Sequence, residues 1–406
     1  MKIISGGVTA AKGFKASGVH AGVKAGSSPD KNDLAMILCD VEAAAAGVYT
    51  MNRVKAAPIY VTMEHLENGV ARGIIANSGN ANACAPMGHE NAVKMCEAAA
   101  SATGLRPEDF IVASTGVIGV PLNVAAIEAA CPTLSSLLSR DGSMEAARAI
   151  MTTDTVPKEI AVSFEIGGKE VRLGGIAKGS GMIHPNMGTM LCFLTTDCAI
   201  TPDVLQGALY DITKITFNRV SVDGDTSTND SCVILASAQA GNPVIDWKSE
   251  DYEVFLEALR YVCTELAKKI AGDGEGATKL VTCTVSGSRS DEAAEKLAME
   301  VIKSSLVKAA MFGADANWGR VLCAMGYSKA PFRPEYVDVS FASAAGEIQV
   351  CRAGEGLAFD EELAKKILTQ SEVEIRVNVN EGEHSVTAWG CDLTYDYVKI
   401  NGDYRT

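Results

Sequence analysis

Residues 177–197 read Ala-Lys-Gly-Ser-Gly-Met-Ile-His-Pro-Asn-Met-Gly-Thr-Met-Leu-Cys-Phe-Leu-Thr-Thr-Asp, and they join a polar, Gly-rich loop directly to an apolar run. We expect a buried strand over Met190–Thr195, which would place the hydroxyl of Thr189 at the head of that strand. Threonine is a weak nucleophile unless an adjacent amine takes its proton, and a cut before Thr189 would create that amine on the same residue. A β-branched residue that merely starts a strand explains the same spacing.

On both sides of this stretch, short apolar runs alternate with Ala-rich segments, which predicts an α/β layered architecture, an α+β sandwich. Further strands are expected at Met36–Cys39, Gly73–Ala76, Phe110–Ser114 and Val162–Ile166. Helices are expected at Glu90–Ser101, Ser143–Met151, Pro202–Lys214 and Tyr252–Ile270. The last of these carries one apolar stripe, Phe255, Leu259, Val262, Leu266 and Ile270, which indicates core packing.

The segment Ala271–Lys279 interrupts the pattern with glycines and charges, and a new alternation follows it. It comprises a strand at Leu280–Ser286 and a helix over Asp291–Ala310 with Ser290 as its N-cap. Later strands are expected at Tyr336–Ala342, Glu347–Cys351, Glu372–Val377 and Ser385–Trp389. We therefore expect a domain boundary near residue 280, with an α/β sandwich domain over residues 1–280 and a smaller C-terminal α/β domain over residues 281–406.

A second segment with chemical potential is Phe110–Gly119, in which a strand ends in Ser114-Thr115-Gly116. The hydroxyl of Thr115 and the N–H of Gly116 are a pair of donors of the kind that stabilises an oxyanion, commonly by about 3–4 kcal/mol per donor. A plain turn after a strand accounts for the same residues.

Composition limits the classes of function. The 406 residues carry 36 Lys and Arg against 50 Asp and Glu, a net charge of −14, without the basic cluster that nucleic acid or an anionic membrane requires. No apolar run approaches the roughly 20 residues needed to span a bilayer. The 12 cysteines form no CxxC pair, and the N-terminus lacks a signal-like apolar region. We expect a cytoplasmic protein with buried thiols.

Motifs for metals and nucleotides fail on inspection. Asp223–Asp230 begins like a calcium loop, but Thr228 occupies the position that requires glycine. The glycines at 272, 274 and 276 are not followed by Gly-Lys-Ser/Thr, and the five histidines are dispersed. We therefore expect no metal, no bound cofactor and no histidine base.

Eight segments together resemble one known family, the ornithine acetyltransferase or ArgJ family of arginine biosynthesis, also called glutamate N-acetyltransferase. They are AKGSGMIHPNMGTMLCF (177–193), STGVIG (114–119), MTTDTVPK (151–158), NSGNANAC (77–84), SVDGDTSTND (221–230), AGDGEGATK (271–279), FGADANWGR (312–320) and YVKINGDYRT (397–406). The resemblance covers the whole chain in order. Gly188 and Gly402 stand where many members have Ala, and both are small-for-small changes.

The resemblance implies a precursor that cleaves itself between Gly188 and Thr189, giving an α chain of 1–188 and a β chain of 189–406. It implies the self-cleaving, N-terminal-threonine nucleophile fold shared with an aminopeptidase superfamily. Thr189 would accept acetyl from N-acetylornithine and pass it to glutamate, with Thr115 and Gly116 as the oxyanion hole. Positions matching the family's substrate contacts are Thr152, Lys178, Thr189, Glu275, Asn401 and Thr406. Lys178 suits a carboxylate and Glu275 an ammonium group.

The resemblance further implies an α2β2 heterotetramer without nucleic-acid or membrane partners. Monofunctional and bifunctional members share these motifs, which leaves open whether acetyl-CoA is also a substrate. Two alternatives to acetyl transfer remain: an amidohydrolase or aminopeptidase of the same fold, in which water takes the acyl group, and a non-catalytic binding protein. A protein of the last kind would not need the triad of Thr189, Thr115 and Gly116.

Overall fold

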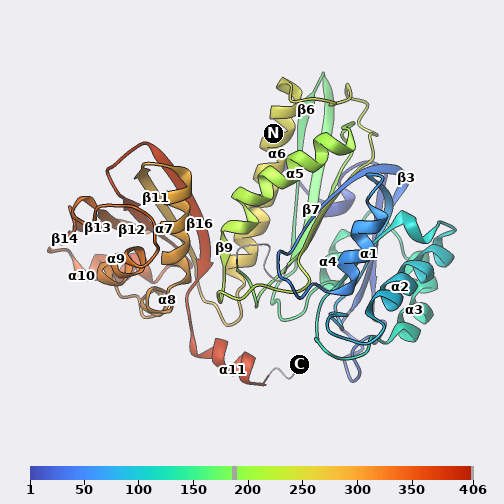
Figure 1. Ribbon diagram of the computed structural model, residues 1–406, viewed down its shortest axis with the longest axis horizontal. Coiled ribbons are helices and arrows are strands. Elements are labelled where there is room, and N and C mark those ends of the chain that lie inside the picture. Colours follow the sequence, from blue (N-terminus) through green and yellow to red (C-terminus); the bar gives the residue numbers. More distant parts are fainter. Residues whose placement is uncertain (185–189, 404–406) are drawn as a thin grey trace.

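The computed structural model describes residues 1–184 and 190–403, and it forms two lobes, each with its own β-sheet (Figure 1). Over these residues the N-terminal lobe contains a nine-stranded sheet with the order β1-β6-β7-β8-β10-β3-β4-β5, in which β2 also pairs with β3. Its strands are β1 (Lys2–Ile4), β2 (Phe14–Val19), β3 (Leu34–Tyr49), β4 (Val70–Asn77), β5 (Phe110–Ser114), β6 (Lys158–Ile166), β7 (Lys169–Lys178), β8 (Leu191–Thr196) and β10 (Ser231–Ala236).

Helices cover this sheet on both faces, which confirms the layered α/β architecture predicted from the sequence. The helices of this lobe are α1 (Ala57–His65), α2 (Gly88–Thr103), α3 (Val124–Ser136), α4 (Ser143–Ala149), α5 (Pro202–Ile215) and α6 (Glu250–Gly272), with single turns η1 (Gly7–Thr9), η2 (Pro107–Asp109) and η3 (Phe217–Arg219). Helices α5 and α6 pack on one face and α4 on the other, while α1 and α2 pack at the β4–β5 edge and α3 packs against α2, β2 and β3.

Strand β8 lies at the centre of the sheet and is buried along its whole length. Cys192 and Leu194 pack into the core beneath α5 and α6, whereas Leu191 and Phe193 pack into the core beneath α4. Since successive side chains of a strand point to opposite faces, a continuous apolar run is what a strand covered on both faces requires.

Helix α6 shows the same agreement between pattern and packing. Ser249 begins it, because its hydroxyl accepts a hydrogen bond from the N–H of Tyr252. The five residues of the predicted apolar stripe are all buried against the sheet.

The C-terminal lobe contains a seven-stranded sheet, counted over the described residues, with the order β14-β13-β12-β15-β11-β16-β9. Its strands are β9 (Val220–Ser221), β11 (Leu280–Ser288), β12 (Asp338–Ser343), β13 (Gly346–Arg352), β14 (Glu355–Gly356), β15 (Glu372–Asn378) and β16 (His384–Cys391). Its helices are α7 (Asp291–Lys303), α8 (Ser305–Phe312), α9 (Trp318–Gly326) and α10 (Glu361–Leu368), with the turn η4 (Pro334–Tyr336). The expected domain division at residue 280 stays a prediction, and β9 comes from the N-terminal side of it.

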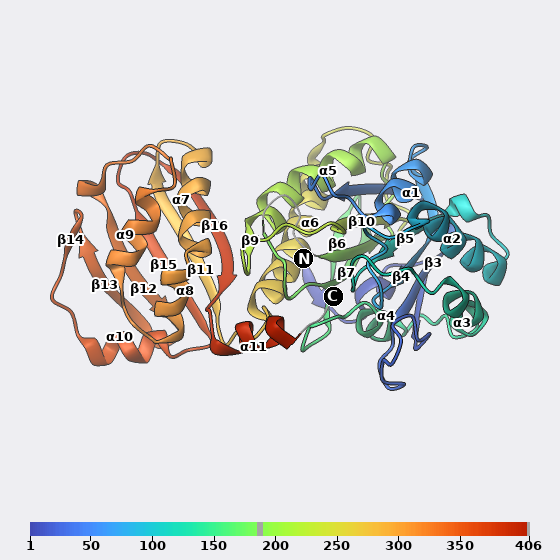
Figure 2. The same cartoon turned by 60° about the horizontal axis from the view of Figure 1, so that its bottom comes forward.

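The last described helix, α11 (Tyr395–Asp403), leaves the C-terminal lobe and extends toward the N-terminal lobe (Figures 1 and 2). No residue of α11 is buried, and Tyr395 and Val398 are strongly exposed.

Three sequence expectations are wrong in detail. The helix expected over Asp291–Ala310 is two helices, because the hydroxyl of Ser304 accepts from the N–H of Val307 and starts a new helix there. The strand expected from Tyr336 begins at Asp338, since Tyr336 ends the turn η4. Ten cysteines are buried as expected, but Cys84 and Cys323 are exposed. Within residues 1–184 and 190–403, no helix has the length and apolar character to cross a membrane.

Candidate active site

One of the described sequence-predicted residues, Lys178, lies directly at the N-terminal end of β8. Lys178, the last residue of β7, pairs with Leu191, and Leu191 also pairs with Ser231 at the start of β10. Gly188, Thr189 and Thr406 lie outside the described residues, so Met190 marks the site on the β8 side. Its N–H donates to Asp230 Oδ1 over 2.9 Å, and its carbonyl accepts from the N–H of Ser231 over 3.1 Å.

Asp230 is fully buried beside Met190. Its Oδ2 has no hydrogen-bond partner among the described residues. Burial raises the pKa of this carboxyl well above its ordinary value, although the N–H of Met190, Thr50 and the charge of Lys178 oppose that shift. A fully buried carboxyl is costly, and such a group is expected where chemistry rather than stability requires it.

The two expected oxyanion donors lie on the loop that follows β5. Gly116 has φ 126°, and a Cβ there would stand 2.9 Å from the backbone nitrogen of Asn80, so only glycine fits without displacement. The backbone of Thr115 bridges to Asn80, and the N–H of Thr115 donates to the carbonyl of Asn77 over 2.9 Å.

Asn229 holds that loop against the start of β8. Its side-chain amide donates to the carbonyl of Ser114 over 2.9 Å and to that of Ala81 over 2.6 Å. Since the next residue, Asp230, binds the N–H of Met190, two consecutive side chains connect the Thr115–Gly116 loop to the residue after Thr189.

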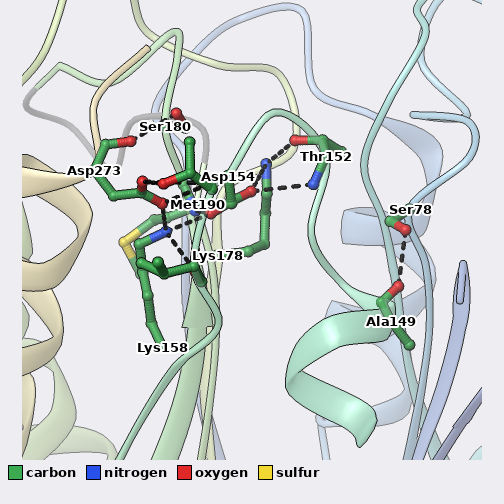
Figure 3. Close-up of polar contacts among 12 residues, drawn as sticks. Ser78, Ala149, Thr152, Asp154, Lys158, Lys178, Ser180, Met190 and Asp273 are labelled. Carbon is green, nitrogen blue, oxygen red and sulfur yellow. Dashed lines mark hydrogen bonds and ion pairs between the residues drawn. The ribbon is translucent and has the colours of Figure 1, made fainter. Parts of the chain in front are cut away.

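Lys178 and Thr152 are in direct contact. The Nζ of Lys178, a side chain that is only 2% exposed, donates to the hydroxyl of Thr152 over 2.6 Å. Burial lowers the pKa of Lys178, and the carboxylate of Asp154, 3.8 Å away, opposes that loss. The two residues lie close together in a group of buried polar side chains (Figure 3).

Glu275 and Asn401 form a second pair. The amide of Asn401 donates to Glu275 Oε2 over 2.7 Å, which brings α11 to the loop after α6. The N–H of Glu275 donates to the carbonyl of Ser180 over 2.9 Å, and a Cβ at Gly181 would lie 2.4 Å from the Glu275 carboxylate. The Gly-rich loop after Lys178 is thus what lets Glu275 approach.

Asp223 binds the loop that lies before the predicted cut, at Met182 and Ile183. Its carboxylate accepts from the N–H groups of Met182 and Ile183 over 2.5 and 3.0 Å. His184 follows, with Nδ1 3.2 Å from the hydroxyl of Ser221, and burial lowers its pKa to about 4. The imidazole is therefore neutral at pH 7.

Sequence reasoning missed the functional partners of the expected residues: Asp154, Lys158, Asp223, Asn229, Asp230 and Asp273. All six stand inside segments that the family resemblance singles out, but their pairings join positions far apart in the chain. The signal in the sequence that could have pointed to them is the presence of polar and charged residues within segments otherwise rich in Gly and Thr.

A cleft of about 690 Å³ lies beyond this group, between α6 and the starts of β11 and β15. Lys158 and Asp273 line it, whereas Thr115, Gly116, Lys178 and Glu275 do not, so we do not place the substrate there. Over the described parts of the chain, no three His, Cys, Asp or Glu side chains gather as a metal site would require.

Comparison with known proteins places this geometry in context. The model of the ArgJ family matches residues 15–406. The arginine biosynthesis bifunctional protein ArgJ of Symbiobacterium thermophilum is 52% identical over 407 residues, covering all of both chains, and ArgJ 1 of Clostridium acetobutylicum is 50% identical, covering 97% of this chain and 96% of its own. A crystal structure of the Bacillus halodurans ArgJ protein, 46% identical, superposes with a TM-score of 0.50 and covers 52% of this chain and 98% of its own.

Proposed function

The chain belongs to the ArgJ family, and on that premise we propose that it transfers an acetyl group from N-acetylornithine to glutamate in arginine biosynthesis. The observation that carries the proposal is that Asn229 and Asp230 link the loop bearing Thr115 and Gly116 to Met190, the residue that follows Thr189, while Lys178 pairs with Leu191. That arrangement offers oxyanion donors and a cation around one strand end.

The proposed reaction has two steps. The Thr189 hydroxyl oxygen bonds to the acetyl carbon, the amide C–N bond breaks, and the α-amine of ornithine leaves with a proton. The α-amine of glutamate then attacks the acetyl ester and restores the hydroxyl. The amine of Thr189 carries the proton in both steps. The hydroxyl of Thr115 and the N–H of Gly116 stabilise the oxyanion, and no bound cofactor takes part.

Substrate recognition in this proposal uses the two pairs around the site. Lys178 with Thr152 binds the α-carboxylate, and Glu275 with Asn401 binds the terminal ammonium of ornithine, with Thr406 assigned to substrate by family position alone. Because Lys178 is buried in the uncut chain, we expect binding to follow cleavage rather than precede it.

Self-cleavage between Gly188 and Thr189 is part of the same proposal. The Thr189 oxygen attacks the carbonyl of Gly188, the peptide C–N bond breaks to free the amine, and water opens the resulting ester. One comparison supports it: the chain of the Bacillus halodurans protein is covered over 98% of its length yet spans 52% of this chain, which is near the share of residues 189–406. We place the enzyme in the cytoplasm as an α2β2 assembly.

A second activity is proposed because the curated relatives are named bifunctional. It is the formation of N-acetylglutamate from acetyl-CoA, with Thr189 again as the acceptor. Release of CoA with glutamate as the sole acceptor tests it, and a purified enzyme that transfers from N-acetylornithine but releases no CoA lacks this activity.

The main test is the mass of the β chain. Incubation with N-acetylornithine alone should add one acetyl group to residues 189–406 and none to residues 1–188, and initial rates should follow ping-pong kinetics. Thr189→Ala should give one uncut, inactive chain, while the control Thr369→Ala, at the exposed end of α10, should cleave and react normally. Two chains from Thr189→Ala, or a β chain without acetyl, would refute the mechanism.

The same assay separates the alternative of a hydrolase. A transferase releases free ornithine in step with glutamate consumption, whereas a hydrolase releases acetate at the same rate with or without glutamate.

A further inference from the structure

Beneath the proposed substrate contacts lies a buried group of three charges that none of the reaction steps uses. The Nζ of Lys158 donates to Asp154 Oδ1 over 2.7 Å and to Asp273 Oδ2 over 2.5 Å. The side chains of Lys158 and Asp154 are 0% exposed and that of Asp273 is 8% exposed. Burying three charges is costly even when they are paired, so a group of this kind is weak evidence for stability and calls for another explanation (Figure 3).

One side of this group reaches the carboxylate-binding pair. Asp154 Oδ1 also accepts from the N–H of Gly179 over 2.7 Å, and its Oδ2 accepts from the N–H of Thr152 over 3.0 Å. The same carboxylate lies 3.8 Å from the Nζ of Lys178. Asp154 therefore holds the backbone at Thr152 and at Gly179, on both sides of the Lys178–Thr152 contact. Its carboxylate also supplies the negative charge that faces Lys178.

The other side reaches the ammonium-binding pair. The carboxylate of Asp273 accepts from both the N–H and the hydroxyl of Thr155, and its carbonyl accepts from the hydroxyl of Ser180 over 2.7 Å. The carbonyl of Ser180 in turn receives the N–H of Glu275 over 2.9 Å. Asp273 is thus two residues from Glu275 and bound to the loop that follows Lys178.

We propose that Asp154, Lys158 and Asp273 form a positioning cluster that holds Lys178 and Glu275 at a set separation, so that the enzyme measures the distance between the carboxylate and the terminal ammonium of its substrate. This inference rests on the proposed function, since it assigns how the same site selects a diamino acid. The three are positioning residues, because each acts through Lys178, Thr152 or Glu275 and contacts no reacting atom.

Electrostatics gives the cluster a measurable signature. Burial lowers the pKa of Lys178, and the positive charge of Lys158 lowers it further. The negative charges of Asp154, Glu275 and Asp230 act in the opposite direction. Burial also acts to raise the pKa of Asp154, but the charges of Lys178 and Lys158 outweigh it and hold that pKa well below the usual range. Removing the Asp154 charge therefore lowers the pKa of Lys178 further, and the ammonium that should bind a carboxylate is lost at a lower pH.

The first experiment measures this pH dependence in the cleaved enzyme. In Asp154→Asn, the KM for N-acetylornithine and the calorimetric Kd for L-ornithine should rise on the order of tenfold at the alkaline end of the pH profile and recover toward wild type as the pH falls. The control Asp197→Asn also removes a buried carboxylate that accepts two backbone N–H groups, from Lys12 and Arg172, but it follows the opposite end of β8. Its profile should match wild type.

The second experiment measures selectivity and does not depend on the first variant. N-acetylnorvaline has the carbon chain of N-acetylornithine without the terminal ammonium. In Asp273→Asn, the preference in kcat/KM for N-acetylornithine over N-acetylnorvaline should fall roughly tenfold, because Glu275 is displaced, while the KM for N-acetylnorvaline changes little. A merely structural role would weaken both substrates alike.

The two experiments distinguish a failure of this inference from a failure of the proposed function. If the cleaved variants keep the wild-type pH profile and the wild-type preference, the cluster does not position the site and the inference is wrong. If Asp273→Asn weakens both substrates equally, the inference is also wrong. A wild-type enzyme that neither transfers acetyl nor binds ornithine would instead refute the proposed function.

Discussion

Replacing Lys158 by Met should destabilise the protein far more than an ordinary loss of an ion pair. Met fills much of the same volume, but it leaves the carboxylates of Asp154 and Asp273 without the cation that lies 2.7 and 2.5 Å from them. Removing one partner from a buried pair costs about 3–5 kcal/mol, because a buried charge is left uncompensated. At about 2–4 °C per kcal/mol, the expected drop in Tm is roughly 10 °C.

The control for Lys158→Met is Lys296→Met on α7. Lys296 also donates to a carboxylate, that of Glu292, over 2.7 Å, but these side chains are 49% and 79% exposed. Exposed pairs contribute little, and the loss should stay below about 1 kcal/mol. Thermal unfolding followed by circular dichroism compares the two variants directly.

The pH dependence of the Lys158→Met penalty follows from the sign of the Asp154 shift. In the wild type the pKa of Asp154 lies well below the usual range, so its contribution is present above the ordinary Asp pKa and is lost as pH falls through the lowered value. Without Lys158 the carboxylate of Asp154 takes up a proton at higher pH than in the wild type, so the difference in stability from wild type should be largest at alkaline pH and shrink on acidification. Equal Tm values for the two variants, or a penalty that grows on acidification, would refute this reasoning.

Three further predictions concern activity. Gly116→Ala should lower kcat by about 10²–10³, because the new Cβ meets the backbone of Asn80 and shifts an oxyanion donor, whereas Gly207→Ala, with open space around its Cβ, should not change kcat. Thr189→Ser should cleave at least partly and retain acetyl transfer, as seen by gel and by β-chain mass, since it keeps the nucleophilic oxygen. Deleting residues 401–406 should leave self-cleavage intact and raise the KM for both substrates, because the Asn401–Glu275 contact is lost, and an unchanged KM would show that this tail is only structural.

Local patterns predicted most elements because the burial of each element depends on its own sequence. The strand expected at Phe110–Ser114 coincides with β5, and the apolar run after Thr189 is the buried strand β8. The helix expected over Asp291–Ala310 failed because propensity favours a continuous helix, whereas the Ser304 hydroxyl competes for the backbone and starts a new one.

The candidate site was less accessible to sequence reasoning because its partners are distant in the chain. Lys158 and Asp273 are separated by 115 positions, and Asn229 and Ser114 by 115 as well. No sequence periodicity encodes such pairs. The family resemblance indicated the positions that contact substrate, but not the residues that hydrogen-bond to them. Asp223 and Asp230 illustrate the gap, since the failed calcium-loop pattern drew attention to their segment without indicating what the two carboxylates bind.

Those two carboxylates bear on the proposal that one threonine serves both cleavage and transfer. Asp223 binds the N–H groups of Met182 and Ile183 upstream of the expected cut, and Asp230 binds the N–H of Met190 just downstream of it. Both anchors belong to the single segment 221–230, so breaking the bond before Thr189 releases neither flank from its support. Residue 190 also keeps its contact with Ser231 of the neighbouring strand. In the proposed mechanism, the nucleophile would therefore stand next to Met190, and Asn229 of the same segment holds the loop after β5 through the carbonyl of Ser114.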